Sequence, residues 1–216
     1  MTETGKRANN ATISDLGIKH ATAHWNLSPE ELADIAIKEG QAILTSTGAI
    51  NIKTGEFTGR SPMDRFIVKD TVTEESVWWG DVNLPFSSVK FDELHQKMLQ
   101  YLQNKEIYVR DAYACADEKY RINIRVVNEY AWSNMFAYNM FLRPSNSEIQ
   151  SFTAEWVILN APGFMADKKV DGTRQHNFAI LNFTKKIILI GGTAYTGEIK
   201  KGIFSALNFI LPHQKN

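Results

Sequence analysis

Two adjacent lysines, Lys200 and Lys201, stand where a helix is expected to begin. They follow an apolar run at residues 187–190 and a glycine pair at residues 191–192, which together predict a buried strand and a tight turn. Ammonium groups are unfavourable in the first turn of a helix because the N-terminal end of the helix dipole is positive. A bound phosphate or carboxylate would compensate both lysines, since the free N–H groups of that turn also attract anions. The pair therefore indicates an anion-binding site.

The two lysines are expected to differ in their surroundings, because neighbouring helix residues point about 100° apart. The apolar stripe of this helix comprises Ile199, Ile203, Leu207 and Ile210. Lys201 belongs to the opposite, polar stripe, whereas Lys200 lies nearer the apolar side. A partly desolvated lysine loses proton affinity and can act as a neutral ligand or proton carrier, so this geometry favours Lys200 for that role. The plain alternative is that both are solvated surface lysines.

A third candidate, Arg60, lies in the glycine-punctuated loop at residues 54–62. The planar donor fork of a guanidinium on such a loop suits bidentate recognition of a carboxylate. The alternative is a structural arginine that pairs with Asp64. Tyr195, just before the lysines, has two similar interpretations: an aromatic wall for a ligand, or a core aromatic above the turn.

Two further patterns lack part of what a cofactor site needs. Gly192 and Gly197 have the spacing of the phosphate-binding loop G-x-x-x-x-G-K-[ST], but Glu198 stands in place of its lysine. His20 and His24 are four residues apart and would share one face of a helix, yet no nearby acid or cysteine completes a metal coordination set. The chain therefore contains no P-loop, and a metal at the histidine pair is the less favoured alternative.

The composition limits the classes of partner. The 216 residues carry 24 basic and 24 acidic side chains, so a formal charge of zero favours neither nucleic acid nor an acidic membrane as a partner. Cys115 is the single cysteine, which excludes an internal disulfide and suits a reducing cytosol; its plain interpretation is a small buried residue. The polar N-terminus predicts no secretion signal, and the apolar runs are too short to span a bilayer.

The remaining pattern predicts a mixed α/β domain, with a sheet flanked by helices, after a flexible tail at residues 1–12. A capping box, Ser28 to Glu31, opens the first helix, and Gly40 ends it. Apolar periodicity predicts two more helices, at residues 91–102 and 129–141. Strands are expected at residues 42–46, 49–52, 64–68, 106–113, 120–127, 156–159 and 178–183, with a long connection at 71–88.

Three motifs in series resemble the ATP-dependent phosphoenolpyruvate carboxykinases. They are T-G-E-F-T-G-R-S-P-M-D-R-F-I-V at residues 54–68, N-M-F-L-R-P at 139–144 and L-I-G-G-T-A-Y-T-G-E-I-K-K-G-I-F-S at 189–205. The resemblance runs in order over nearly the whole chain from about Gly17. It implies the α/β N-terminal substrate domain of that family at residues 13–216, with the C-terminal P-loop nucleotide domain absent from this sequence.

The resemblance also implies an activity. Members of the family convert oxaloacetate and ATP to phosphoenolpyruvate, CO₂ and ADP in gluconeogenesis, in the cytoplasm, with Mg²⁺ and Mn²⁺ in the site. Decarboxylation gives an enolate, whose oxygen attacks the γ-phosphoryl group in line. By the same resemblance, Arg60 binds the substrate carboxylate and Tyr195 packs beside it, Lys201 ligates Mn²⁺ and approaches the γ-phosphate, and Lys200 helps to neutralise the transferring group. This gives metal ligation to Lys201, whereas helix geometry favours Lys200 as the neutral amine.

Two positions depart from the family pattern: Met63 stands where a lysine is expected, and Thr196 where glycine or alanine is expected. The favoured hypothesis is a substrate-binding fragment that is inactive alone, because phosphoryl transfer needs the nucleotide domain. The alternative is a stand-alone, non-catalytic module that binds anions or dimerises. The apolar surface proposed for such a dimer comprises Phe204, Phe209, Ile210 and Leu211.

Overall fold

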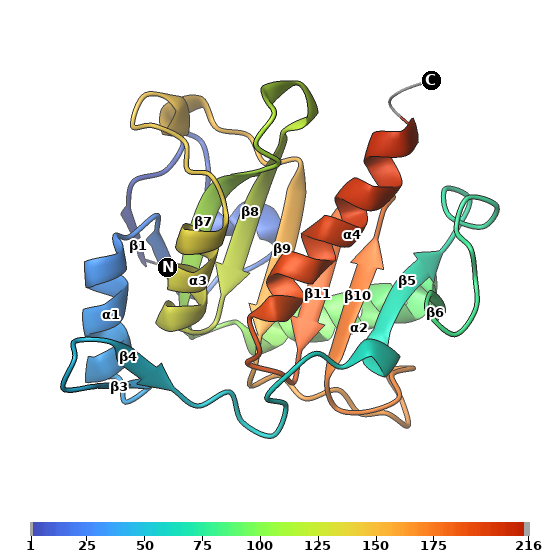
Figure 1. Cartoon of the computed structure of the whole chain (residues 1–216), viewed down its shortest axis with the longest axis horizontal. Helices are drawn as coiled ribbons and strands as arrows, with labels where there is room; N and C mark the ends of the chain where they lie inside the picture. Colours follow the sequence, from blue (N-terminus) through green and yellow to red (C-terminus); the bar gives the residue numbers. More distant parts are fainter. Residues whose placement is uncertain (1, 214–216) are drawn as a thin grey trace.

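The computed structural model describes residues 2–213, which form a large mixed sheet with helices on both faces (Figure 1). The helices are α1 (Pro29–Lys38), α2 (Ser88–Tyr101), α3 (Ala131–Met140) and α4 (Gly197–His213). The nine strands of the sheet are β1 (Thr2–Gly5), β2 (Thr22–Trp25), β5 (Arg65–Lys69), β6 (Leu84–Ser87), β7 (Glu106–Ala114), β8 (Ile122–Asn128), β9 (Trp156–Ala161), β10 (Phe178–Asn182) and β11 (Ile187–Gly191). A separate hairpin consists of β3 (Ala42–Leu44) and β4 (Ile50–Ile52). The mixed α/β prediction is confirmed.

The strand order places the start of α4 at one edge of the sheet. The order is β1-β2-β7-β8-β9-β11-β10-β5-β6, in which the β7–β8 and β10–β11 pairs are antiparallel and the other neighbours are parallel. Strands β8, β9 and β11 therefore run together and end at the same edge, while β2 and β7 end at the opposite edge. Helix α4 begins just after β11 and runs back across the sheet (Figure 1).

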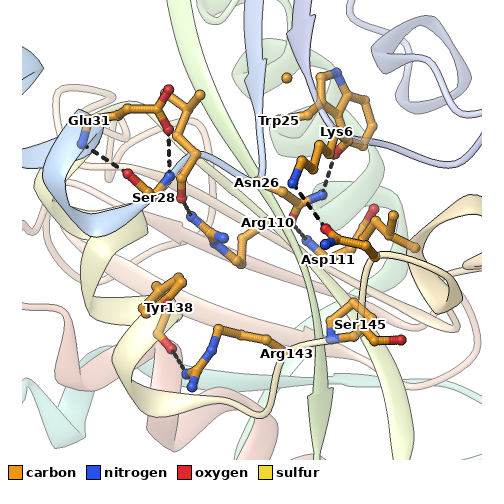
Figure 2. Close-up of a pocket in the computed structure, with 15 residues that line it drawn as sticks. Lys6, Trp25, Asn26, Ser28, Glu31, Arg110, Asp111, Tyr138, Arg143 and Ser145 are labelled. Atoms are coloured by element: carbon orange, nitrogen blue, oxygen red, sulfur yellow. Dashed lines mark hydrogen bonds between the residues drawn. The ribbon is translucent and has the colours of Figure 1, made fainter.

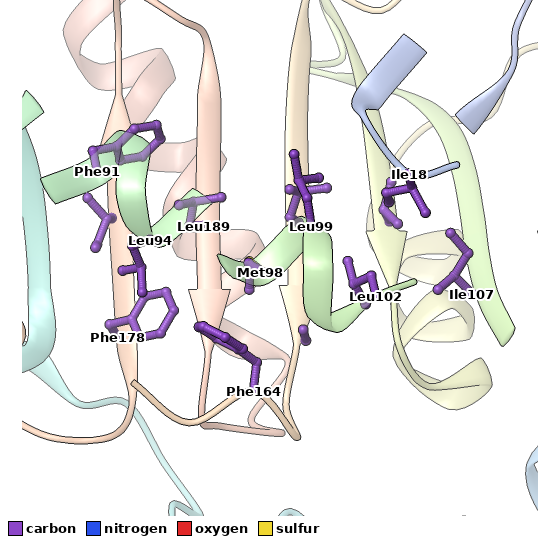
Figure 3. Packing of buried hydrophobic residues seen from close by; sticks show 14 of the residues in the cluster. Ile18, Phe91, Leu94, Met98, Leu99, Leu102, Ile107, Phe164, Phe178 and Leu189 are labelled. Atoms are coloured by element: carbon purple, nitrogen blue, oxygen red, sulfur yellow. The ribbon is translucent and has the colours of Figure 1, made fainter. Parts of the chain in front are cut away.

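Helix α2 covers one face of the sheet. Phe91, Leu94 and Met98 of α2, and Leu102 just after its last residue, have no exposed surface and pack against Leu189 and other strand residues (Figure 3). Their spacing is that of one helix face, so burial on this side follows directly from the apolar period. The predicted helix is confirmed, and it begins three residues earlier than its first apolar residue.

Helices α3 and α4 cover the other face. Ile199 and Ile203 of α4 are buried against strand residues such as Ile188, as the apolar stripe predicts. A Cβ at Gly202 would lie 3.0 Å from a methyl carbon of Ile188, so this glycine lets the helix pack close to the sheet. Leu207 and Ile210 of the same stripe are half-buried at the margin of this cluster.

Helix α1 and the β3–β4 hairpin agree with the sequence prediction. The Ser28 hydroxyl accepts from the Glu31 N–H at 3.2 Å, and the Glu31 carboxylate accepts from the Ser28 N–H at 2.8 Å. This reciprocal pair is the capping box that the sequence predicts. Leu32 and Ala36 are fully buried, and the helix packs beside α3.

The N-terminal residues differ from the prediction. Thr2–Gly5 form β1, parallel to β2, in place of the expected flexible tail, and β2 itself was not predicted. The Glu3 carboxylate accepts from the Trp25 indole N–H at 2.8 Å and from the Thr12 hydroxyl at 2.7 Å, which fixes this polar segment on the sheet edge. Strand pairing and two side-chain bonds thus order a stretch that has no apolar period.

Three further expectations can be compared with the structure. His24 lies on β2, where its ring stacks on Tyr108 at 5.4 Å, so the histidine pair does not share a helix face. Cys115 is half-buried at a turn with φ 79°, rather than fully buried. None of the helices within residues 2–213 is long and apolar enough to cross a membrane.

Candidate active site at the start of helix α4

A tight turn after β11 determines where α4 begins. Gly192 has φ +68°, and a Cβ on it would lie 2.5 Å from the backbone oxygen of His176. A Cβ on Gly197 would lie 2.4 Å from the ring of Tyr195. Gly192 therefore requires glycine, because its backbone is left-handed and approaches the backbone of the segment before β10, whereas at Gly197 the Tyr195 side chain would have to move.

A buried acid ties the loop at residues 54–62 to this first turn. Glu198 is only 2% exposed; one carboxylate oxygen accepts from the Ser61 N–H at 3.3 Å, and the other lies 3.6 Å from Arg65 Nε. Arg65 in turn donates to the Ser205 hydroxyl of α4 at 2.9 Å. Burial raises the pKa of Glu198 and lowers the pKa of Arg65, while the attraction between them opposes both shifts. The ion pair thus holds Arg60, next to Ser61, beside the start of the helix.

Hydrogen bonds from the segment before β10 complete the support. Asn177 donates to the Ser61 hydroxyl at 2.8 Å, and Gln175 donates to the Asp64 carboxylate at 3.0 Å. Burial raises the pKa of Asp64, and the nearby Arg174 charge opposes this shift. Among residues 2–213 no ion pair joins Arg60 to Asp64, so the structural alternative for Arg60 is not what the structure shows.

Three of the four predicted site residues lie at the start of α4 or just before it, at Tyr195, Lys200 and Lys201. The hydrogen bond between Ser61 and Glu198 brings the loop that carries the fourth, Arg60, to the same place. Arg60 and Lys200 are exposed, and Tyr195 and Lys201 are half-buried. The Lys201 amine lies 5.3 Å from the ring centroid of Phe204, so its stem follows an aromatic surface. The expectation of a partly desolvated Lys200 is wrong, because the buried surface of this helix is provided by residues 199, 203 and 206 and leaves Lys200 in water.

The candidate cations around the start of α4 form no ion pair within the described chain, although the Arg60 charge does act on Glu198. The ion pairs among residues 2–213 include none formed by Arg60, Lys200 or Lys201. The nearest acid in sequence, Glu198, is engaged by Arg65 and Ser61 instead. An anion bound here would therefore meet cations that are not already neutralised.

The described residues do not form a metal site on their own. Within residues 2–213 no group of three or more His, Cys, Asp or Glu side chains is placed to hold a metal ion. The Lys201 amine is one possible ligand, but the neighbouring carboxylates of Glu198 and Asp64 are directed at Arg65, Ser61 and Gln175. This donor set does not fit a complete metal centre, so the other ligands would have to come from outside it.

Sequence reasoning missed Arg65 and the burial of Glu198. An acid in the first turn of a helix is ordinarily a surface feature that favours the dipole, so nothing local marks Glu198 as buried. Arg65 begins β5, and its partners lie 133 or more positions further along the chain, at Glu198 and Ser205. Both roles depend on long-range contacts that have no periodic signal.

Comparison with known proteins decides the family. The profile of the family described as "Phosphoenolpyruvate carboxykinase" matches residues 21–216. The chain belongs to the phosphoenolpyruvate carboxykinase family. The resemblance carried by the three motifs is thereby confirmed.

Curated relatives in the phosphoenolpyruvate carboxykinase family are named phosphoenolpyruvate carboxykinase (ATP). The protein of Christiangramia forsetii is 66% identical over 205 residues, which are 95% of this chain and 38% of that relative. The protein of Flavobacterium johnsoniae is 61% identical over 97% of this chain and 39% of its own length. The protein of Geobacillus kaustophilus is 44% identical over 96% of this chain and 39% of its own length. The chain thus spans less than two-fifths of the length of each of these three relatives.

Proposed function

We propose that this chain is the substrate-binding domain of an ATP-dependent phosphoenolpyruvate carboxykinase, a carboxy-lyase of gluconeogenesis that converts oxaloacetate and ATP to phosphoenolpyruvate, CO₂ and ADP. The observation that carries this proposal is the set of unneutralised cations, Arg60, Lys200 and Lys201, around the start of α4. The names of the relatives specify ATP as the phosphoryl donor. The proposed domain comprises residues 13–216 together with the β1 strand that pairs with it.

Each candidate residue has a role that its chemistry supports. The Arg60 guanidinium binds the carboxylate of oxaloacetate or phosphoenolpyruvate with two parallel hydrogen bonds. Tyr195 packs beside the same substrate. Lys200 and Lys201 place positive charge near the enolate and the transferring phosphoryl group, where negative charge accumulates in the transition state. The N-terminal N–H groups of α4 add to this field.

The proposal assigns the nucleotide site to sequence outside this chain. ATP, with Mg²⁺ and Mn²⁺, would be bound mainly by a P-loop domain, and Lys201 would be the ligand that this chain contributes to Mn²⁺. The metal would stabilise negative charge on the reacting oxygens. Because phosphoryl transfer depends on positioning by both domains, we expect the chain alone to bind but not to turn over substrate. The absence of paired cysteines supports a cytoplasmic location.

Calorimetric titration with oxalate, an enolate mimic, tests the proposal with and without Mn²⁺. We expect Arg60→Ala to weaken oxalate binding at least about tenfold, because charge-assisted hydrogen bonds contribute about 1.5–3 kcal/mol. Lys201→Ala is expected to remove any enhancement by Mn²⁺. Lys53→Ala, which removes an exposed cation immediately before the loop that carries Arg60, is the matched control and should leave binding unchanged. Binding that Arg60→Ala leaves intact would refute the proposed role of Arg60.

The alternative of a dimerising module has one supporting observation. Phe204, one of the four residues proposed for the dimer surface, is 52% exposed. Phe209, in contrast, packs on Phe183 at 4.3 Å between ring centroids and contributes less free surface than expected. Light scattering at high concentration tests self-association: a dimer that Phe204→Ser dissociates supports this alternative, and a strict monomer counts against it.

A further inference from the structure

A cavity of about 540 Å³ lies at the edge of the sheet opposite the start of α4 (Figure 2). It forms because β2 ends at Trp25, opposite Val109, while β7 continues to residue 114. Asn26, at φ 51°, turns the chain away from the sheet, and its side-chain oxygen accepts from the Asp111 N–H at 2.8 Å. The lining includes Asn26 and Asp111 but none of the candidate active-site residues.

Arg110 lines the inner part of this cavity and is only 3% exposed. Its guanidinium donates to the Leu27 carbonyl, and to the Asn134 side-chain oxygen at 3.2 Å from Nε and 3.0 Å from Nη2. These partners are all neutral, and no ion pair among residues 2–213 includes Arg110. The adjacent carboxylate, Asp111, is occupied by Arg125 at 2.7 Å. Arg110 is thus a buried cation that forms no ion pair with any of residues 2–213.

Such an arrangement is unusual, because a buried charge is ordinarily paired with an opposite charge. Burial is the main cause that lowers the pKa of the Arg110 guanidinium to about 10; the nearby Arg143 charge acts in the same direction, and Tyr138, Asp111 and Glu31 oppose the shift. A group with this pKa remains protonated at neutral pH. Nη1, which none of the hydrogen bonds described for residues 2–213 uses, is available for a ligand in the cavity.

The mouth of the cavity is also cationic. The Arg143 guanidinium lies 4.4 Å and that of Arg110 5.0 Å from the ring centroid of Tyr138, so both cations share one aromatic wall. Lys6 lies across the mouth and donates to Asn146 at 3.0 Å (Figure 2). Glu31 is the other acid in the lining, and it is exposed and engaged in the α1 capping box.

We propose that this cavity binds a small organic anion, with its carboxylate or phosphate on Arg110 and its body against Tyr138. Arg143 and Lys6 would add charge at the mouth. The volume is within the range of about 300–1,000 Å³ that is usual for small-molecule sites. An anion here would supply the counter-ion that Arg110 lacks in the described chain.

Calorimetry on the Arg60→Ala/Lys200→Ala/Lys201→Ala triple variant tests the proposal, because this background removes the three proposed active-site cations. The probes are citrate and inorganic phosphate, each at constant ionic strength set with chloride. We expect at least one probe to bind in the millimolar range or tighter. Arg110→Met, which removes the charge and keeps an apolar stem, should weaken that probe at least about tenfold. The probe that binds distinguishes a carboxylate site from a phosphate site.

Substitutions at exposed positions test the proposal without disturbing the fold, which Arg110→Met could do. Arg143→Gln combined with Lys6→Ala should weaken binding several-fold, since both side chains lie at the surface. Arg121→Gln is the matched control: Arg121 stacks on Tyr113 at 4.8 Å and does not line the cavity, so its loss should have no effect on binding. The proposal is overturned if neither probe binds at tens of millimolar, or if binding survives both Arg110→Met and the double substitution unchanged.

Discussion

Gly192 joins β11 to α4, and its replacement by alanine tests whether the close approach at this turn positions the candidate active site. The residue has φ +68°, and an added Cβ would lie 2.5 Å from the His176 carbonyl oxygen and 2.7 Å from Asn177 Cα. Both neighbours are backbone atoms, so neither can move without displacing the segment before β10. Asn177 also supports Ser61, so the displacement would reach the loop that carries Arg60.

The expected destabilisation has two parts. The left-handed backbone conformation costs about 1–2 kcal/mol for a residue with a Cβ. Relieving the overlap with the backbone adds about 1–3 kcal/mol, as is typical of overpacking. Gly48 is the matched control, because it has φ +84° in the β3–β4 turn but no atom within 4 Å of an added Cβ. Gly48→Ala should therefore lose only about 1–2 kcal/mol, the cost of the left-handed backbone.

Urea unfolding of both variants measures the difference between these two parts. We expect Gly192→Ala to lose about 2–5 kcal/mol of unfolding free energy, clearly more than Gly48→Ala. Oxalate binding should be weakened by Gly192→Ala and unchanged by Gly48→Ala. Equal destabilisation by the two substitutions would refute the reasoning, since it would mean that the overlap is relieved at no cost. Oxalate binding that Gly192→Ala leaves unchanged would mean that this turn does not position the candidate active site.

Two more predictions concern the buried acid and the core. Burial raises the pKa of Glu198 above its ordinary value of 4.5, so the native state binds protons more readily than the unfolded state. The contribution of this group to the free energy of unfolding is therefore fully present below pH 4.5 and is lost as pH rises through the native pKa. Glu198→Gln should flatten this decline in the free energy of unfolding, measured by urea unfolding, by up to about 1.4 kcal/mol per pH unit, and parallel curves for both chains would contradict it. Met98→Ala should cost about 2–5 kcal/mol by cavity formation, whereas Val89→Ala, 64% exposed on the same helix, should change stability by less than about 0.5 kcal/mol. Equal losses in urea unfolding would contradict the assigned burial.

The elements that the sequence predicted well are those with a local signal. Phe91 and Leu94 of α2, and Ile199 and Ile203 of α4, repeat at helical spacing and lie on buried faces. The capping box at Ser28 likewise needs only residues within one turn. Periodicity and caps therefore located these helices without tertiary information.

The missed strands lie mainly at the margins of the sheet. β6 is an edge strand in the expected long connection and contains Pro85, which an edge strand tolerates because one side of its backbone has no partner. β1, at the other edge, is polar throughout. Each is ordered by pairing with a single neighbouring strand, and such pairing leaves no period in the sequence. The contacts of Glu198 could not be predicted for the same reason, because its partners come from segments that are distant in the sequence.

The cations of the two proposed sites form no ion pairs among residues 2–213 and lie at opposite ends of the strands, and the cost of lacking an acidic partner differs between the two places. Arg60 and Lys200 are exposed, and water solvates an exposed charge well enough that lacking an acidic partner costs little. Their assignment to substrate binding therefore depends on the family as well as on their position. Arg110 is withdrawn from water, and its hydrogen-bond partners among residues 2–213 are all neutral, so its charge has a free-energy cost that a bound anion would reduce. The proposal of a bound anion in the cavity above Arg110 therefore depends on burial and charge, and not on the family.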